Sequence, residues 1–151
     1  MNWILKPFDQ LTPRELYAIL QLRNEVFVVE QNCVFQDADG KDGYCHHLMA
    51  WEPGYLAAYT RLVPPDLAYP GFASIGRVVS SPKSRGTGLG KELMERSIGE
   101  AKNLFPGFPI RIGAQLYLKK FYTELGFQQT DEIYLEDGIE HIEMTLSETP
   151  K

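Results

Sequence analysis

The stretch SPKSRGTGLGKEL, residues 81–93, carries three glycines at alternating positions directly behind Arg85. Because glycine has no Cβ atom, successive backbone N–H groups in such a turn can approach an anion closely. Residues 88–105 place apolar side chains at three- to five-residue steps and predict a helix, whose N-terminus adds the positive end of a dipole. The stretch therefore predicts a site for a phosphate group at the start of a helix.

The rest of the sequence predicts strands and helices in a single domain that covers residues 1–151. Apolar runs predict strands at residues 2–8, 46–52, 55–64, 72–81 and 108–115. The segment 128–146 predicts a closing hairpin turned at Asp137 and Gly138. Helices are expected at 11–27, 88–105 and 116–127. This order predicts an α+β fold (α/β three-layer), with a mixed and mostly antiparallel twisted sheet flanked by helices.

The first predicted helix has a clear start. Thr12 can cap its N-terminus, Pro13 suits the first helical position, and Glu15 completes a capping box. One face of this helix is mostly apolar: it runs at three- to four-residue steps through Leu16, Leu20, Asn24 and Phe27, with Ile19 and Arg23 beside them. The last predicted helix ends at Gly126, which suits a left-handed C-cap.

Composition and charge exclude several classes of partner. The net charge of -5 argues against a nucleic-acid backbone as the ligand. No apolar run approaches the ~20 residues needed to cross a bilayer, and the first residues lack the basic start of a signal peptide. The two cysteines, Cys33 and Cys45, are too few for a disulfide framework. We therefore expect a cytoplasmic protein with a small anionic ligand and no nucleic-acid or membrane partner.

Three kinds of phosphate site can be compared with the glycine turn. In a P-loop, Arg85 would stand where the first glycine belongs, and Glu92 would stand where a hydroxyl should bind magnesium. In a dinucleotide-binding turn, Lys91 would replace a required glycine or alanine. The remaining pattern is Arg-x-x-Gly-x-Gly at residues 85–90, which includes the arginine.

This pattern, with the strand and the proline before it, resembles the coenzyme A loop of the GNAT N-acetyltransferase superfamily. A second motif, KKFYTELGF at residues 119–127, is similar to the last helix of that superfamily, and a strand lies between the two motifs in the matching order. The resemblance covers residues 74–146. Within the superfamily, LRNEVFVVEQNCVFQDADGKD (22–42), HHL (46–48) and LEDGIEHIEM (135–144) are similar to the small ElaA-like branch.

The resemblance implies that acetyl-CoA is the co-substrate and lies in a central splay between two parallel strands. The cofactor-binding residues expected on this basis are Val78, Val79, Ser80, Arg85, Gly86, Thr87, Gly88, Leu89 and Gly90. Strand alternation places Val78 and Ser80 on one side of their strand and Val79 on the other. Tyr122 occupies the position of the general acid of the family, and a phenol can protonate a leaving thiolate.

The implied reaction is acetyl transfer to a primary amine of a small molecule or peptide, by direct attack in a ternary complex. A homodimer is allowed as well. Two other functions stay open. One is a non-catalytic coenzyme A-binding sensor or interaction module. The other is an acyltransferase similar to acyl-homoserine-lactone synthases, suggested by LRNEVF (22–27). The general base stays open as well, because the strand at 72–81 has no carboxylate, and Glu30, Glu136, His141 or a water chain could serve.

Two polar clusters bear on metal binding and charge. The segment DADGKD (37–42) has the composition of a calcium loop, but its glycine stands fourth rather than sixth, so a solvated turn is expected. The contiguous Cys45, His46 and His47 lack the ligand spacing of a zinc site, and we expect no metal. Five carboxylates lie close together in the sequence with Lys41 as the only basic residue among residues 25–42: Glu25, Glu30, Asp37, Asp39 and Asp42. A solvated acidic loop is favoured for them. The alternative is an entrance to the acceptor site that attracts cationic amines.

Overall fold

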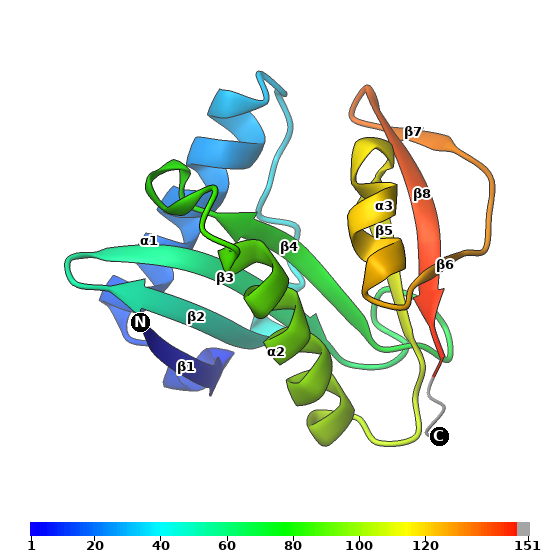
Figure 1. The fold of residues 1–151 in the computed structure, drawn as a ribbon. Coiled ribbons are helices and arrows are strands. Elements are labelled where there is room, and N and C mark those ends of the chain that lie inside the picture. The colour runs from blue at the N-terminus through cyan, green and yellow to red at the C-terminus, as the bar shows by residue number, and fades with distance from the viewer. Residues whose placement is uncertain (148–151) are drawn as a thin grey trace.

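The computed structural model describes residues 1–147 and contains two four-stranded sheets (Figure 1). The first sheet has the order β1 (Asn2–Pro7), β2 (His46–Glu52), β3 (Tyr55–Val63) and β4 (Ser74–Ser80). In the second sheet, β8 (Ile139–Leu146) pairs with β5 (Ile110–Gln115), β6 (Gln128–Gln129) and β7 (Tyr134–Glu136). All pairings within the two sheets are antiparallel.

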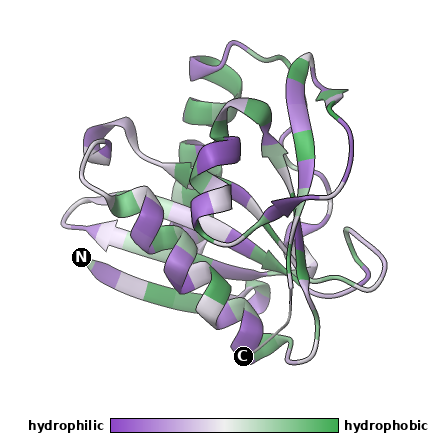
Figure 2. Ribbon diagram, turned by 45° about the vertical axis from the view of Figure 1, so that its right-hand side comes forward, coloured by the Kyte–Doolittle hydropathy of each residue, from purple (hydrophilic) through white to green (hydrophobic). Residues whose placement is uncertain are grey.

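Three α-helices flank these sheets: α1 (Pro13–Arg23), α2 (Leu89–Leu104) and α3 (Lys119–Glu124). α1 and α2 cover opposite faces of the first sheet, and α3 lies against the second (Figure 1). Figure 2 shows that hydrophobic residues gather on the strands between these helices. Shorter helical segments are the π-helical Asn24–Glu30 and the 3-10 turns Phe8–Gln10, Asp42–Tyr44, Pro82–Ser84 and Leu116–Leu118. Across residues 1–147, every helix is too short or too polar to cross a membrane.

The start of α1 is confirmed, and its predicted apolar face is confirmed in part. Thr12 Oγ1 accepts a hydrogen bond from the Glu15 N–H at 3.1 Å, and Glu15 Oε1 accepts one from the Thr12 N–H at 2.8 Å. Ile19 and Arg23 are buried, whereas Asn24 is exposed and the other predicted residues are only half-buried. From Asn24 the backbone widens into a π-helix, so four-residue steps no longer follow one face.

β4 and β5 run parallel and are bridged where they begin. The Ala73 N–H donates to Pro109 O at 3.0 Å, and the Arg111 N–H donates to Ala73 O at 2.9 Å. Within the described part of the chain the two strands share no further bridge, and they diverge toward their carboxyl ends (Figure 1). The predicted fold class, with its splay between two parallel strands, is confirmed. The splay leaves the facing edges of β4 and β5 without a ladder partner.

A β-bulge in β4, which the sequence alone does not predict, lies beside the splay. The register of β4 against β3 shifts after Gly76, so Thr60 alone faces both Arg77 and Val78. Arg77 has a φ of 51°, in the left-handed region that residues other than glycine rarely adopt. A bulge leaves its extra residue out of the ladder and re-aims the neighbouring backbone groups. Backbone groups of β4 are thereby available to a ligand in the splay.

Candidate functional site

A cavity of about 650 Å³ opens in the splay between β4 and β5. Residues 75–80 of β4 form one wall, and residues 112–115 of β5 form the other. Phe121 and Tyr122 of α3 close one side, while the π-helical segment and the β7–β8 turn border the rest. The lining is mainly apolar with a small number of polar groups, as is usual for sites that bind small molecules.

The glycine turn joins β4 to α2 and places backbone donors at one end of this cavity. Gly86 (φ 79°) and Gly88 (φ 80°) adopt the left-handed conformation that glycine favours, and Gly88 is the N-cap of α2. No side chain among residues 1–147 caps that end, so the first N–H groups of α2 lack a side-chain acceptor. A Cβ atom added to Gly86, Gly88 or Gly90 would meet no atom within 4 Å. The open space and the free donors fit the pyrophosphate of coenzyme A.

Thr87 and Leu89 hold the turn in place. Thr87 Oγ1 donates to Ser84 O at 2.7 Å, which closes the loop on itself. The Leu89 side chain is buried under α2 and packs in the same cluster as Leu93. Leu89 is therefore suited to contact a ligand only through its main chain. Arg85 and Gly90 are the members of the predicted loop set that line the cavity directly.

Arg85 already has a carboxylate partner in this structure. Its two terminal nitrogens lie 2.5 and 2.6 Å from the carboxylate oxygens of Glu30, in a bidentate pair that the sequence does not predict. Hydrogen bonding from Arg85 lowers the pKa of Glu30, and the same interaction raises the pKa of Arg85. Arg85 can bind a phosphate only if this pair opens or is shared.

Val78, Val79 and Ser80, the strand residues predicted to bind the cofactor, all line the cavity. Val78 packs toward α2, whereas Val79 packs in the cluster under α1, so the predicted alternation of these two valines is confirmed. Both valine side chains belong to the core. A ligand in the splay therefore meets the backbone edge of β4 rather than its side chains.

Tyr122 is fixed where α3 ends, with its ring buried and facing the cavity. The Phe127 N–H donates to Tyr122 O at 3.1 Å and the Gly126 N–H donates to Thr123 O at 3.0 Å, a Schellman motif with Gly126 at a φ of 104°. The predicted left-handed cap is thus confirmed. Burial, and then the nearby Tyr117, raises the pKa of Tyr122 to about 12. At neutral pH the phenol therefore carries its proton.

Beside the cavity lies a cluster of three arginines and three aspartates, here called the ionic cluster: Arg23, Arg61, Arg77, Asp37, Asp39 and Asp42. Asp37 joins two of the arginines, with Arg23 Nε 2.7 Å from Oδ2 and Arg77 Nε 2.9 Å from Oδ1. Arg61 lies 2.6 Å from an oxygen of Asp39 and 2.9 Å from an oxygen of Asp42. Arg77 is also the bulged residue of β4, so the ionic cluster holds the bulge.

The ionic cluster corrects part of the interpretation of residues 37–42 as a solvated turn, since residues 38–40 are exposed but Asp37 is buried. Asp37 is only 5% exposed, and all three aspartates form ion pairs with arginines. These ion pairs leave the aspartates little negative charge for a metal ion or a cationic acceptor. Burial acts to raise the pKa of Asp42, but hydrogen bonds from Arg23 and Arg61 outweigh it and hold that pKa below its ordinary value. An arginine inside the apolar run 55–64 is the sequence signal that could have revealed a buried partner.

Two hydrogen bonds join the halves of the molecule beside the cavity. Gln115 Nε2 donates to Gln31 Oε1 at 3.3 Å, and the Cys33 thiol donates to Asp137 O at 3.3 Å. All four residues line the cavity. No local pattern marks them in the sequence, because their partners are 84 and 104 residues away.

The three side chains considered as a base have different surroundings. Glu30 is held by Arg85, and Glu136 is exposed beside the β7–β8 turn. His141 is 8% exposed and lines the cavity, with Nδ1 2.7 Å from Ile139 O. Within residues 1–147, no group of three or more His, Cys, Asp or Glu residues is placed to hold a metal ion.

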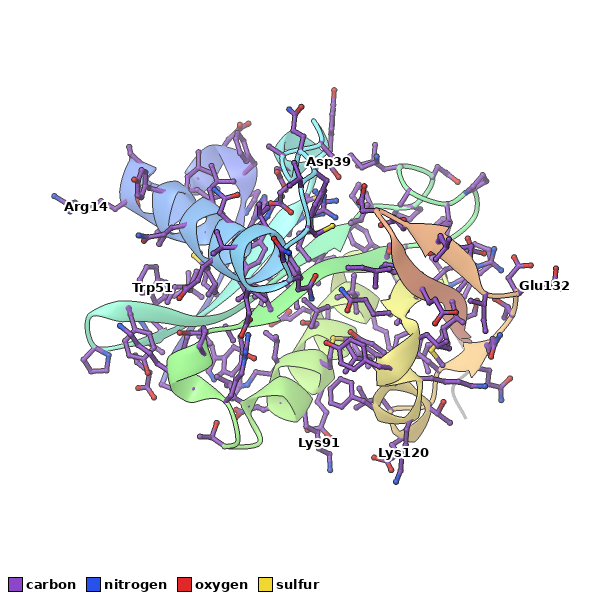
Figure 3. The ribbon with its side chains drawn as sticks, turned by 90° about the horizontal axis from the view of Figure 1, so that it is seen from above. Arg14, Asp39, Trp51, Lys91, Lys120 and Glu132 are labelled. Carbon is purple, nitrogen blue, oxygen red and sulfur yellow. The ribbon has the colours of Figure 1, made fainter. Side chains whose placement is uncertain are left out.

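Charge is distributed unevenly around the site. Figure 3 shows Lys91 of α2 and Lys120 of α3 projecting on the same side of the molecule, with Asp39 on the opposite side. Lys91 follows the glycine turn directly and is exposed. A chain with a net charge of -5 therefore places one basic side chain, that of Lys91, next to the glycine turn.

Comparisons with known proteins agree with this geometry. The family model of the acetyltransferase (GNAT) domain matches residues 15–148. ElaA of Escherichia coli (strain K12) is 42% identical over 146 residues, which cover 95% of this chain and 95% of ElaA. The crystal structure of an acyl-CoA N-acyltransferase from Pseudomonas aeruginosa superposes with a TM-score of 0.92 at 47% identity, over 97% of this chain and 100% of that one.

The fold also extends to more distant structures. yncA of Salmonella typhimurium, solved with its cofactor acetyl-CoA, superposes with a TM-score of 0.72 at 17% identity, over 100% of this chain and 96% of that one. The family match includes the glycine turn, the bulged strand β4 and Tyr122. The chain therefore belongs to the GNAT acetyltransferase family, in which it is similar to ElaA.

Proposed function

We propose that this protein transfers the acetyl group of acetyl-CoA to a primary amine of a small molecule or peptide, by direct attack in a ternary complex. One observation carries the proposal: the glycine turn, the bulged edge of β4 and the phenol of Tyr122 all border the same cavity. Family membership supports the reaction class. The acetyl-CoA bound to yncA supports the choice of acyl donor.

Different parts of the cavity would bind different parts of acetyl-CoA. The glycine turn and the N-terminus of α2 would hold the pyrophosphate, because free N–H groups and the helix dipole both favour negative charge there. The unpaired edge of β4 at residues 78–80 would bind the pantetheine amides as one strand binds another. Acetyl-CoA supplies the acetyl group as a thioester. A backbone N–H released by the bulge would bind the thioester oxygen, where negative charge grows during attack.

Tyr122 would donate its hydroxyl proton to the departing sulfur. With a pKa of about 12, raised mainly by burial, the phenol is protonated at every pH at which the protein would work. A thiol is ordinarily the stronger acid, so full proton transfer from Tyr122 would be uphill if the thiolate were in water. Burial in the same cavity disfavours the charged thiolate as well and raises the pKa of the leaving thiol. The pKa values of the thiol and of the Tyr122 phenol are therefore closer in the cavity than in water.

The test uses the purified protein with acetyl-CoA and a panel of primary amines that spans cationic, neutral, anionic and peptidic acceptors. Release of free thiol is followed as each amine is added, and the acetylated amine is identified by mass spectrometry. Amine-dependent release with a matching acetylated product is the expected result. Tight acetyl-CoA binding without amine-dependent release across the panel would instead identify a coenzyme A-binding module without catalysis.

A further inference from the structure

The proposed reaction needs a base, because a primary amine is mostly an ammonium ion near neutral pH and then lacks the lone pair that attacks. β4 has the sequence SIGRVVS and offers no carboxylate. Both carboxylate oxygens of Glu30 are engaged by Arg85. Glu136 borders the cavity, but its side chain is exposed to solvent and no hydrogen bond within residues 1–147 orients it toward a ligand.

His141 borders the same cavity as the proposed proton donor, Tyr122. It lies in β8 directly opposite Gln115, the last residue of β5. One short helical turn follows Gln115, and α3 begins directly after it. Tyr122 of α3 lines the same cavity as His141. His141 and Tyr122 therefore flank the same end of β5, one from the neighbouring strand and one from the helix that follows.

The imidazole of His141 is held in one orientation. Its Nδ1 lies 2.7 Å from Ile139 O, and because a carbonyl only accepts, Nδ1 carries the proton of the neutral ring. The ring of Tyr134 stacks against it with centroids 5.7 Å apart and planes 29° apart. Within the described residues no hydrogen bond engages Nε2. The neutral ring therefore has its lone pair on Nε2, which is the nitrogen left for a ligand in the cavity.

The ionisable groups around this ring come from several elements. Tyr134 of β7 stacks on it, and Glu136 and Asp137 lie at the β7–β8 turn on the same cavity. Gln115 of β5, its cross-strand neighbour, is uncharged. No arginine or lysine of residues 1–147 is in ion-pair contact with these two carboxylates.

We infer that His141 is the general base of acetyl transfer, an assignment that rests on the proposed function. His141 Nε2 takes one proton from the ammonium group of the acceptor, and Ile139 O holds the resulting imidazolium through Nδ1–H. The freed amine nitrogen forms the C–N bond with the acetyl carbon while the C–S bond breaks. Tyr122 gives its proton to sulfur and regains one from the same nitrogen as the amide forms. His141 then releases its proton to solvent, which balances the reaction.

The direct test is the variant His141→Asn. The asparagine amide can still donate to Ile139 O, but no base remains at the place of Nε2. We expect kcat/KM for a good amine to fall ~10²-fold or more, with the dissociation constant for acetyl-CoA unchanged by calorimetry. Added imidazole, or a pH at which the amine is already neutral, should restore part of the rate. The matched control is His46→Asn, because His46 packs edge-on against Phe105 and does not line the cavity.

A second measurement uses the wild-type protein and does not depend on the folding of a variant. Nitrogen-15 NMR distinguishes the two neutral tautomers of histidine, and His141 should show the Nδ1–H form. His47 should show the opposite form, because its Nε2 lies 2.9 Å from Asp42 O and its Nδ1 accepts from Tyr59 Oη at 2.6 Å. An Nε2–H tautomer at His141 would overturn the assignment.

The outcomes separate the base from the reaction. If the wild-type protein acetylates an amine and His141→Asn retains rates within about 3-fold of it, the proposed function stands and His141 is not the base. If the wild-type protein acetylates no amine of the panel, both the proposed function and the base fall. A His141→Asn variant that also loses acetyl-CoA affinity would show a structural role and overturn the assignment as well.

Discussion

Glu30 and Arg85 hold one another at the end of the cavity where a phosphate fits, with nitrogen–oxygen distances of 2.5 and 2.6 Å. The pair joins the π-helical segment that follows α1 to the glycine turn that precedes α2. Both side chains are 43% exposed. Exposed ion pairs are worth only ~0.2–1 kcal/mol, so a pyrophosphate can compete with Glu30 for the guanidinium.

This competition predicts that Glu30→Gln strengthens the binding of acetyl-CoA. The substitution frees Arg85 and removes a negative charge from the neighbourhood of the pyrophosphate. We expect the dissociation constant measured by calorimetry to fall about 2- to 5-fold, since the pair is exposed. Glu140→Gln is the control, because Glu140 is also exposed, does not line the cavity and forms no ion pair with Arg85. Weaker binding by Glu30→Gln alone would mean that the carboxylate holds Arg85 in its ligand-binding position.

The glycine turn is best tested at Gly90. Gly88 has a φ of 80°, so any side chain there strains the backbone. A loss of acetyl-CoA binding in a Gly88 variant could then result from a disturbed fold rather than from a blocked site. Gly90 lies in the first turn of α2 without a positive φ, borders the cavity and has no atom within 4 Å of an added Cβ. Gly90→Leu should therefore fold and weaken acetyl-CoA binding at least ~10-fold, which corresponds to ~1.4 kcal/mol.

Gly99 supplies the control for that substitution. It lies in the same helix, has equally open surroundings and does not border the cavity. Gly99→Leu should leave the affinity for acetyl-CoA unchanged in the same calorimetric titration. Equal affinities for the two leucine variants would show that no ligand lies against the turn.

The ionic cluster predicts that Asp37 supports stability rather than attraction of the acceptor. Asp37→Ala leaves Arg23 and Arg77 without their shared carboxylate in a buried place, and loss of one partner of a buried pair costs ~3–5 kcal/mol. Chemical denaturation should show a loss of this size in the free energy of unfolding. Glu140→Ala, an exposed carboxylate, should change it by no more than ~0.5 kcal/mol. Similar results for the two variants would restore the interpretation of a solvated loop.

The same cluster predicts a fall of stability in acid. Burial acts to raise the pKa of Asp39, but hydrogen bonds from Arg61 and the Lys41 N–H outweigh it and hold that pKa far below its ordinary value. A carboxyl group with a depressed pKa contributes fully above its unfolded value, near ~3.9, and loses that contribution as pH falls toward its folded value. The free energy of unfolding should therefore be lower at pH 3 than at pH 6. Asp39→Asn should make the difference between the two pH values smaller. An equal loss of unfolding free energy in the variant and the wild-type protein would contradict a contribution of Asp39 to acid sensitivity.

Much of the fold could be predicted because its signals are local. The capping box at Thr12, the left-handed cap at Gly126 and the turn at Asp137 each depend on neighbours within a few residues. The glycine turn before α2 is equally local, since its open space and free donors follow from glycine itself. The parallel splay was expected from family resemblance, because the bridge between Ala73 and Ile110 joins segments that are distant in the sequence.

The rest depends on contacts between distant residues. Four-residue spacing could not predict that Arg23 would be buried, because its partners Asp37 and Asp42 lie beyond the end of the helix. The bulge at Arg77 depends on β3 and on the ionic cluster together. Likewise, the orientation of His141 depends on how β8 turns back along β5.

The most direct measurement of acetyl transfer in this cavity compares the wild-type protein with Tyr122→Phe. The substitution keeps the buried ring and removes only the hydroxyl, so the fold and acetyl-CoA affinity should persist. With an amine that the wild-type protein acetylates, kcat for coenzyme A release should fall ~10²-fold or more while the calorimetric affinity stays within about 2-fold. Unchanged kcat in the folded variant would contradict the assignment of Tyr122 as the proton donor and, with it, the proposed chemistry of the cavity.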